Sequence, residues 1–195
     1  MRKEAIRHGA GRLRIIGGEW RGLKLNFPGE VANLRPTPDR VRETLFNWLT
    51  NRIHGARCLD LFAGSGALGL EALSRGASHC TFVDNAAAAA EAVRGHLSQL
   101  NAHQRATVVC GNALQWQGAP FDVVFVDPPY SSDLGGSALE HLVHEGLLAN
   151  DARIYLEMER NQAPPPIPAS LEVIRDKVAG NVRYQLLAIA DNVCL

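Results

Sequence analysis

The sequence predicts an α/β fold in which a mostly parallel sheet carries helices on both faces. From residue 57 onward, short apolar runs of strand length alternate with longer stretches of helical character. The strand-like runs are near-continuously apolar and do not alternate with polar residues, which is typical of strands that are covered on both sides. With 195 residues and 46% hydrophobic content, the chain is long enough to form one domain with a sizeable core.

The first part of the chain predicts a small basic extension. A basic tail over residues 1–11 precedes a hairpin from Arg12 to Phe27, in which apolar residues lie on either side of Gly17-Gly18. Pro28 to Pro36 follows as a loop. We place this extension at residues 1–34.

The main domain, at residues 35–195, opens with a helix that begins at Thr37-Pro38 and ends at Gly55. Strands and helices then alternate. The strands are expected at 58–62, 79–83, 106–110, 121–126 and 153–158, and the helices at 66–76, 86–101 and 136–148, with a short turn near 113–116.

The end of the chain departs from this alternation. Residues 162–169 contain four prolines and cannot form a regular helix, so one crossover is expected to be a loop. The apolar runs 171–174 and 184–189 lie on either side of Gly180-Asn181 and predict a closing antiparallel pair of strands.

Charge is distributed unevenly along the chain. The formal net charge is zero, from 20 basic and 20 acidic residues. Residues 1–57 hold twelve Lys and Arg against five acids, a surplus of seven positive charges that the rest of the chain balances. A basic front attracts phosphate backbones, so this half favours a nucleic-acid partner, with a solvated arginine-rich face as the plainer alternative.

Composition argues against several other classes. The four cysteines show no zinc spacing, and the first three fall in or beside expected strands, where a thiol behaves as a small buried apolar group. His141 and His144 share a helical face without a carboxylate or thiol partner, so we expect no metal site. The N-terminus lacks the apolar segment of a leader, and no stretch approaches the ~18 apolar residues of a membrane span. We expect a cytoplasmic monomer.

The tetrapeptide Asp127-Pro128-Pro129-Tyr130, at the end of the apolar run 121–126, suits the binding of a planar amino group. Consecutive prolines stiffen the turn and leave carbonyl oxygens facing a ligand. An aspartate oxygen and a proline carbonyl can accept both hydrogens of an exocyclic amine, and Tyr130 offers a face for stacking. A strand-terminating turn with a tyrosine lid is the alternative.

A glycine-rich turn joins the first strand of the main domain to a helix. Gly64-x-Gly66-x-x-Gly69 matches the dinucleotide fingerprint, and Asp84 follows at the tip of the next strand. NAD and S-adenosylmethionine both contain an adenosine ribose, so the pattern alone leaves both open. Two features favour S-adenosylmethionine: the short stretch after the fourth strand leaves little room for a dehydrogenase's substrate domain, and a nicotinamide site has no use for the tetrapeptide.

These motifs resemble a known family. Asp60-x-Phe62-Ala63-Gly64-x-Gly66 is similar to motif I of the class I S-adenosylmethionine-dependent methyltransferases. Over most of its length the chain resembles the bacterial 16S rRNA guanine-N2-methyltransferases of the RsmD type; the resemblance is carried by residues 14–22, 35–49, 59–71 and 127–130, and more weakly by 177–180. It implies a Rossmann-like fold, S-adenosylmethionine as cofactor, and methylation of a guanine N2 amine in an assembling or assembled 30S subunit.

The resemblance also implies a cofactor site. Residues 64–66 would bend around the methionine part of the cofactor, Asp84 would hold the ribose, and Asn85 would pack beside the adenine. Either Arg40 or Arg42 would pair with the methionine carboxylate, with a solvated helix face as the alternative for both. The cofactor-binding candidates are Asp60, Phe62, Ala63, Gly64, Ser65, Gly66, Asp84, Asn85, Asn112, Ala113, Arg40 and Arg42.

One candidate departs from the pattern of this fold. The position after Gly111 usually carries an aspartate that accepts from the adenine amino group, and this chain has Asn112. An amide oxygen can still accept that hydrogen bond but without charge assistance, so we expect a modest loss of affinity. A helix N-cap is the alternative role of Asn112.

The catalytic candidates are Asp127, Pro128, Pro129 and Tyr130. A guanine amine has its lone pair delocalised into the ring, so we expect catalysis mainly by alignment. Asp127 and the Pro128 carbonyl region would hold the two N–H groups while Tyr130 stacks on the extruded base.

The RNA-binding candidates lie on the hairpin. Arg12, Arg14, Arg21 and Lys24 would bind rRNA phosphates, and Trp20 is a candidate for stacking on a base.

Two alternative functions remain open. An adenine-N6 DNA or RNA methyltransferase would use the same tetrapeptide but normally brings a target-recognition insertion, and a non-catalytic rRNA-binding assembly factor would retain the fold.

Overall fold

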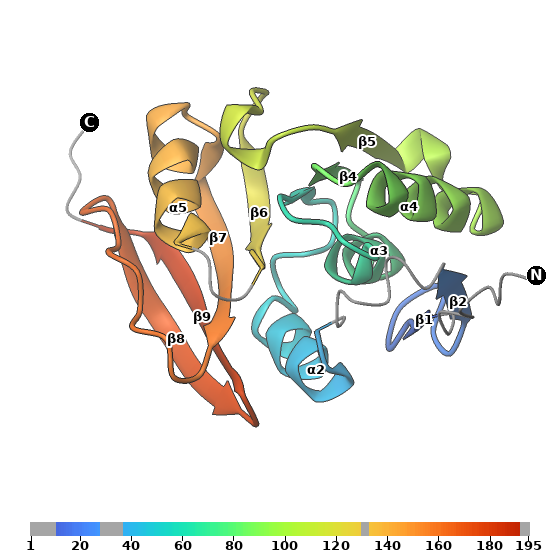
Figure 1. Ribbon diagram of the computed structural model, residues 1–195, viewed down its shortest axis with the longest axis horizontal. Helices are drawn as coiled ribbons and strands as arrows, with labels where there is room; N and C mark the ends of the chain where they lie inside the picture. Colours follow the sequence, from blue (N-terminus) through green and yellow to red (C-terminus); the bar gives the residue numbers. More distant parts are fainter. Residues whose placement is uncertain (1–10, 28–36, 130–132, 192–195) are drawn as a thin grey trace, which may run out of the picture.

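The computed structural model describes residues 11–27, 37–129 and 133–191. Within these residues the chain forms a two-stranded sheet and a seven-stranded sheet with helices around it (Figure 1). The elements, in chain order, are β1 (Gly11–Arg14), β2 (Lys24–Phe27), α2 (Asp39–Trp48), β3 (Arg57–Asp60), α3 (Ala67–Ser74), β4 (His79–Asp84), α4 (Ala87–Gln99), η1 (His103–Arg105), β5 (Ala106–Cys110), η2 (Ala113–Gln115), β6 (Phe121–Val126), α5 (Leu134–His144), β7 (Leu148–Glu159), β8 (Leu171–Ala179) and β9 (Val182–Ile189).

The large sheet has the order β5-β4-β3-β6-β7-β9-β8. Strands β3 to β7 run parallel, and β9 pairs antiparallel with both β7 and β8. The chain moves outward from β3 through β4 to β5 and then returns to the other side of β3 with β6. The carboxyl ends of β3 and β6 therefore lie at a topological switch point, where open α/β sheets bind their ligands.

Both faces of the sheet are covered, as the apolar strands predict. Val123 and Phe125 of β6 belong to a core that includes side chains of α2, α3 and α4. The alternate residues Val124 and Val126 belong to a second core with side chains of α5. The parallel sheet with helices on both faces is confirmed.

The hairpin is confirmed, but its strands are joined by a longer connection than Gly17-Gly18. Strands β1 and β2 pair antiparallel with Leu13 opposite Leu25, and both side chains are buried in the core that α3 shares. The Ile15 N–H donates to the Leu23 carbonyl at 3.0 Å, so the chain reverses between these two residues. Figure 1 shows the hairpin beside α3 and α4, at the opposite end of the molecule from β8.

The remaining elements agree with the sequence prediction except at some boundaries. Helix α5 ends at His144 instead of 148, because Gly146 takes a left-handed φ of 63° and the chain then enters β7. The closing antiparallel pair is confirmed, with both strands longer than their apolar runs.

The expected burial holds for two of the first three cysteines. Cys58 and Cys80 are buried as expected, whereas Cys110 is exposed because it lies at the end of β5, the edge strand. In the part of the chain that the structure describes, no helix is long and apolar enough to cross a membrane.

Candidate active site

A cavity of about 730 Å³ opens at the carboxyl ends of β3, β4 and β6. It lies at the switch point of the sheet, between the glycine-rich turn and the start of the tetrapeptide. Its lining residues are Thr37, Asp60, Leu61, Phe62, Ala63, Gly64, Ser65, Ala67, Leu68, Asp84, Asn85, Ala86, Asn112, Ala113, Leu114, Asp127, Pro128, Pro129 and Leu134.

The glycine-rich turn forms one wall of the cavity. Gly66 takes a φ of 79° and stands at the N-cap of α3, a conformation that other residues rarely adopt. Gly66 is absent from the lining, so its part is to shape the turn that presents Gly64 and Ser65. Asp60 fixes the other end of the turn, because its Oδ2 accepts the Gly69 N–H at 2.9 Å.

Asp60 carries an unusual carboxyl group. Burial raises its pKa to about 7, and the nearby charge of Asp84 adds to this, while the hydrogen bond from Gly69 opposes it. A carboxyl group that titrates near neutral pH at the wall of a cavity can change its charge when a cation binds beside it.

Asp84 ties the end of β4 to the same turn. Its Oδ2 accepts the Gly64 N–H at 2.8 Å, and its Oδ1 accepts the Ala86 N–H at 2.8 Å. A carboxylate has about four lone-pair sites, so both oxygens keep capacity to accept from a ligand hydroxyl. Asp84 therefore both orders the cofactor turn and lines the cavity.

Asn112 lines the cavity and also caps the short helix η2, so both roles considered for it are compatible. Its Oδ1 accepts the Leu114 N–H at 3.0 Å. Ala113 and Leu114 provide apolar surface next to it, as Phe62 does on the β3 side. This end of the cavity combines an amide with apolar walls, a combination that suits a purine ring.

Asp127 stands at the end of β6, where the cavity meets the tetrapeptide. The side chain is half-buried, and its Oδ2 accepts the hydroxyl of Thr37 at 3.2 Å. Burial and the charge of Glu157 raise the pKa of Asp127 well above its usual range, against the lowering effect of the Thr37 hydrogen bond. Pro128 and Pro129 continue the lining, and Tyr130 lies outside the described residues.

Thr37 is the site residue that the sequence did not reveal as one. The sequence predicts it only as the start of a helix, yet its hydroxyl reaches Asp127 across 90 positions of sequence. The only local signal is its place between two prolines at the start of α2. The other lining residues without a sequence assignment are all apolar: Leu61, Ala67, Leu68, Ala86, Leu114 and Leu134.

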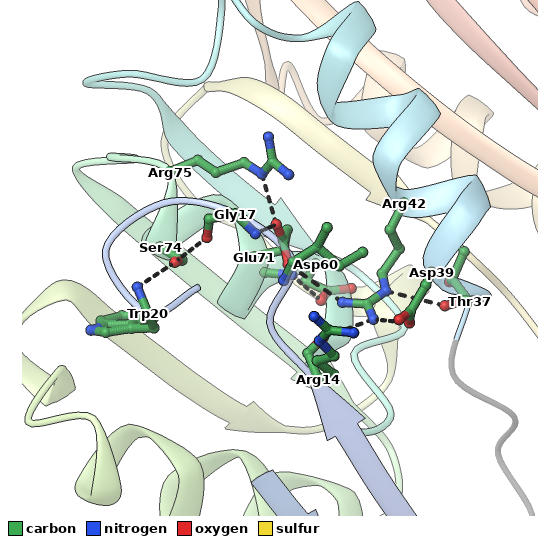
Figure 2. A network of polar contacts seen from close by, with 12 residues as sticks. Arg14, Gly17, Trp20, Thr37, Asp39, Arg42, Asp60, Glu71, Ser74 and Arg75 are labelled. Atoms are coloured by element: carbon green, nitrogen blue, oxygen red, sulfur yellow. Dashed lines mark hydrogen bonds and ion pairs between the residues drawn. The ribbon is translucent and has the colours of Figure 1, made fainter. Parts of the chain in front are cut away.

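The structure contradicts a cofactor contact for Arg42. Its side chain is 1% exposed and lies between α2, the hairpin and α3, outside the cavity lining (Figure 2). Its guanidinium is already bonded to Asp39 and Glu71, so it has no path to a ligand carboxylate. Arg40 is exposed on α2, and it too is absent from the lining.

The prediction that Trp20 stacks on RNA is also wrong, because its side chain is buried. The residue is 7% exposed and packs in the core under the hairpin, with the Arg105 guanidinium 5.5 Å from its ring centroid. Its backbone N–H donates to Ser74 Oγ at 2.9 Å. The basic candidates on the hairpin are all exposed: Arg12, Arg14, Arg21 and Lys24.

The fold and the cavity together define a class of protein. Numbered from β3, the sheet order is 3-2-1-4-5-7-6, with the seventh strand antiparallel. With a glycine-rich turn and an acidic residue at the tips of its first two strands, this is the Rossmann-like fold of the class I methyltransferases. A solved RNA methyltransferase from Salinibacter ruber shares this fold, with a TM-score of 0.64 at 11% identity.

The chain belongs to the family described as "Conserved hypothetical protein 95", the RsmD family, whose model matches residues 13–188. Ribosomal RNA small subunit methyltransferase D of Escherichia coli K12 is 47% identical over 187 residues, covering 94% of this chain and 93% of the relative. The solved structure of the Escherichia coli protein yhhF matches with a TM-score of 0.83 and 46% identity, covering 92% of this chain and 98% of the other. A solved Haemophilus influenzae structure matches with a TM-score of 0.78 and 40% identity, covering 93% and 100%.

Proposed function

We propose that this protein transfers a methyl group from S-adenosylmethionine to the exocyclic N2 amine of a guanine in 16S rRNA. One observation carries the proposal: a single cavity is bordered both by the Asp84-anchored glycine turn and by Asp127 with its two prolines. The relatives named ribosomal RNA small subunit methyltransferase D support rRNA as the substrate. The guanine N2 amine is the finer part of the proposal, and it rests on the resemblance of residues 14–22 and 35–49.

The lining of the cavity fits the cofactor. Asp84 has acceptor capacity for ribose hydroxyls, and the apolar wall around Ala113 and Leu114 suits an adenine. Asp60 places a carboxyl group near the turn that would hold the methionine part, where a positively charged ligand favours its ionised form. When bound, S-adenosylmethionine supplies an electrophilic methyl group on a sulfonium centre.

The protein's part in the reaction is to orient the amine. Asp127 accepts one amine hydrogen and the Pro128 carbonyl region accepts the other, so the nitrogen lone pair is turned toward the methyl donor. Such alignment contributes on the order of 7–11 kcal/mol in well-oriented reactions. The Thr37 hydroxyl holds the Asp127 carboxylate in place during this step.

Asp127 also receives a proton. The amine gains a positive charge when it takes the methyl group, and one N–H must then be lost. Because burial and Glu157 raise the pKa of Asp127, its carboxylate is a stronger proton acceptor than an exposed aspartate. We therefore expect the turnover rate to rise with pH along an acid limb that lies above the usual aspartate range.

The outer face of the hairpin supplies the RNA-binding surface. Arg12, Arg14 and Lys24 alternate with buried residues, and the register sets Arg14 directly opposite Lys24. Like charges at directly opposed positions destabilise a hairpin in isolation. A polyanion on this face relieves that repulsion, which supports rRNA phosphates as its partner.

Charge reversal tests this surface. We expect reversal of three residues to weaken rRNA binding and to lower the slope of log K against log salt by about 2 to 3, from the release of fewer counterions. The variant combines Arg12→Glu, Arg14→Glu and Lys24→Glu.

A matched control reverses two arginines and one lysine near the far strand β8, which are exposed: Arg160→Glu, Arg175→Glu and Lys177→Glu. Filter binding to 16S rRNA at several salt concentrations compares the two. Equal slopes for both variants would mean that the hairpin does not bind RNA.

Nucleoside analysis tests the reaction itself. The protein is incubated with isotopically labelled S-adenosylmethionine and 30S subunits from a strain that lacks its own enzyme, and the 16S rRNA is digested and analysed by mass spectrometry. We expect labelled N2-methylguanosine. Labelled N6-methyladenosine would show that the enzyme methylates the adenine N6 amine instead. Binding to rRNA without any label would indicate a non-catalytic assembly factor.

A further inference from the structure

A buried guanidinium lies between the hairpin and the active site. Arg42 Nη2 donates to the Arg14 carbonyl at 2.9 Å and pairs with Asp39 Oδ1 at 2.6 Å. Its Nη1 is 3.4 Å from Glu71 Oε2, and its Nε donates to the Thr37 carbonyl at 3.2 Å. Figure 2 shows these four partners around one side chain. The guanidinium plane is therefore fixed from several directions.

Glu71 holds this guanidinium against the hairpin. It is 0% exposed, and its two oxygens accept the N–H groups of Ile16 and Gly17 at 2.8 Å each. Oε1 also accepts from Arg75 Nε at 2.7 Å. A carboxylate with this number of donors is restrained in position, so it also restrains the Arg42 guanidinium that pairs with it.

Thr37 connects the guanidinium to the catalytic candidate. Its carbonyl is held by Arg42 Nε, and its hydroxyl donates to Asp127 Oδ2 at 3.2 Å. Thr37 is itself buried and lines the cavity at the end where Asp127 stands. The contacts thus run without a break from Glu71 through Arg42 and Thr37 to Asp127.

We propose that Arg42 is a positioning residue for methyl transfer, which acts through Thr37 to hold the Asp127 carboxylate in the orientation that binds the amine. The proposal rests on the proposed role of Asp127. A buried ion pair adds little net stability compared with apolar packing, so stability alone gives weak reason for this arrangement. Besides attaching the hairpin, the network fixes the orientation of Thr37.

Two substitutions at Thr37 test the last contact. Thr37→Val keeps the shape and removes the hydroxyl, and Thr37→Ser keeps the hydroxyl. We expect the valine variant to lose kcat on the order of tenfold to a hundredfold, as for one hydrogen bond to a charged group, with the serine variant within about threefold of the parent. Equal kcat for all three would overturn the proposal.

The pH dependence gives a readout that a merely structural role would not move. The titratable groups that act on Asp127 are Glu157 on β7 and Asp60 on β3, and both remain in these variants. Loss of the Thr37 hydrogen bond raises the pKa of Asp127 further. The acid limb of the kcat profile should therefore move to higher pH in Thr37→Val and stay in place in Thr37→Ser; an unmoved limb in the valine variant would contradict the proposal.

A double-mutant cycle tests Arg42. Lysine keeps the charge but has one nitrogen in place of the planar fork whose three nitrogens contact four partners, so Arg42→Lys should lower kcat about as much as Thr37→Val. If Arg42 acts through Thr37, the double variant should be about as slow as either single variant. Multiplied losses would show that Arg42 acts independently and would overturn the proposal. Glu71→Gln, which loosens the same guanidinium, replaces Arg42→Lys in the cycle if the lysine variant does not fold.

Two controls separate this inference from the proposed function. Arg94→Lys changes an exposed arginine on α4 and should leave kcat unchanged. Asp127→Ala should abolish turnover whether or not Arg42 is a positioning residue. Activity retained in Asp127→Ala would refute the proposed function. Activity lost in Asp127→Ala but retained in Thr37→Val would refute only the proposal that Arg42 acts through Thr37.

Discussion

The buried carboxylate of Glu71 gives the sharpest test of how the hairpin is attached. Glu71→Gln is nearly isosteric, but it removes the charge and replaces one acceptor oxygen with an N–H donor. The parent side chain accepts from two backbone N–H groups of the hairpin and pairs with two arginines, Arg42 and Arg75. The substitution leaves some of these donors facing another donor.

The structure sets the size of the effect. Breaking a buried ion pair costs about 3–5 kcal/mol when the partner charge remains. We expect the lower end, about 3 kcal/mol, because Arg42 keeps Asp39, whose side chain is 55% exposed, and because Arg75 is 22% exposed and can reach water. For a chain of this length each kcal/mol lowers Tm by about 2–4 °C, so Tm should fall by roughly 6–12 °C.

Thermal unfolding followed by circular dichroism measures this change. The matched control is Glu91→Gln, which removes the same charge from an exposed pair with Arg94 at 3.6 Å. Such surface pairs contribute about 0–1 kcal/mol. Hydrogen exchange should also speed up at the amides of Ile16 and Gly17 in Glu71→Gln alone. Equal Tm values for the two variants would refute the network as the attachment of the hairpin.

Three single residues, Asp60, Asn112 and Trp20, give four further predictions. Asp60 has a pKa of about 7 in the folded protein, above its ordinary 3.8, so it is neutral below pH 7 and ionised above. Because a cationic cofactor favours the ionised form, calorimetry should show S-adenosylmethionine binding that tightens as pH rises toward 7 and levels off above it, with a flat profile in Asp60→Asn. Because the same pKa is raised on folding, the cofactor-free protein should become less stable to unfolding as pH rises from about 4 to about 7. Denaturant titrations of the parent and of Asp60→Asn can check this. Asn112→Asp should tighten cofactor binding several-fold through a charge-assisted bond, and weaker binding would contradict that reasoning. Trp20→Phe should lower Tm without changing rRNA affinity at low temperature, and a loss of affinity would restore Trp20 as an RNA contact.

The sequence predicted the fold well because the signals for it are local. Most strands of the sheet are near-continuous apolar runs, and glycine or proline marks several of the turns, so the order of elements follows from periodicity. The cavity was also largely predictable, since the tips of β3, β4 and β6 must meet at one edge of a parallel sheet. The three acidic residues at these tips, Asp60, Asp84 and Asp127, all line it.

The errors concern side chains whose surroundings are set by distant residues. Arg42 and Trp20 are residue types that often contact ligands or nucleic acid, and nothing near them in sequence indicates that they are buried. Arg42 is buried because Glu71, 29 positions away, supplies its counter-charge. Trp20 is buried because the hairpin folds onto α3, where Ser74 accepts its backbone N–H. The same long-range packing brings Thr37 to Asp127.

The central claim is that Asp127 binds and orients the amine that is methylated. Single-turnover transfer from labelled S-adenosylmethionine to 30S subunits, with cofactor affinity measured on the same samples, tests it most directly. Asp127→Ala should abolish transfer, with cofactor affinity within a few-fold of the parent. Transfer at near-parent rates would contradict the claim, and loss of cofactor binding would show that Asp127 belongs to the cofactor site instead.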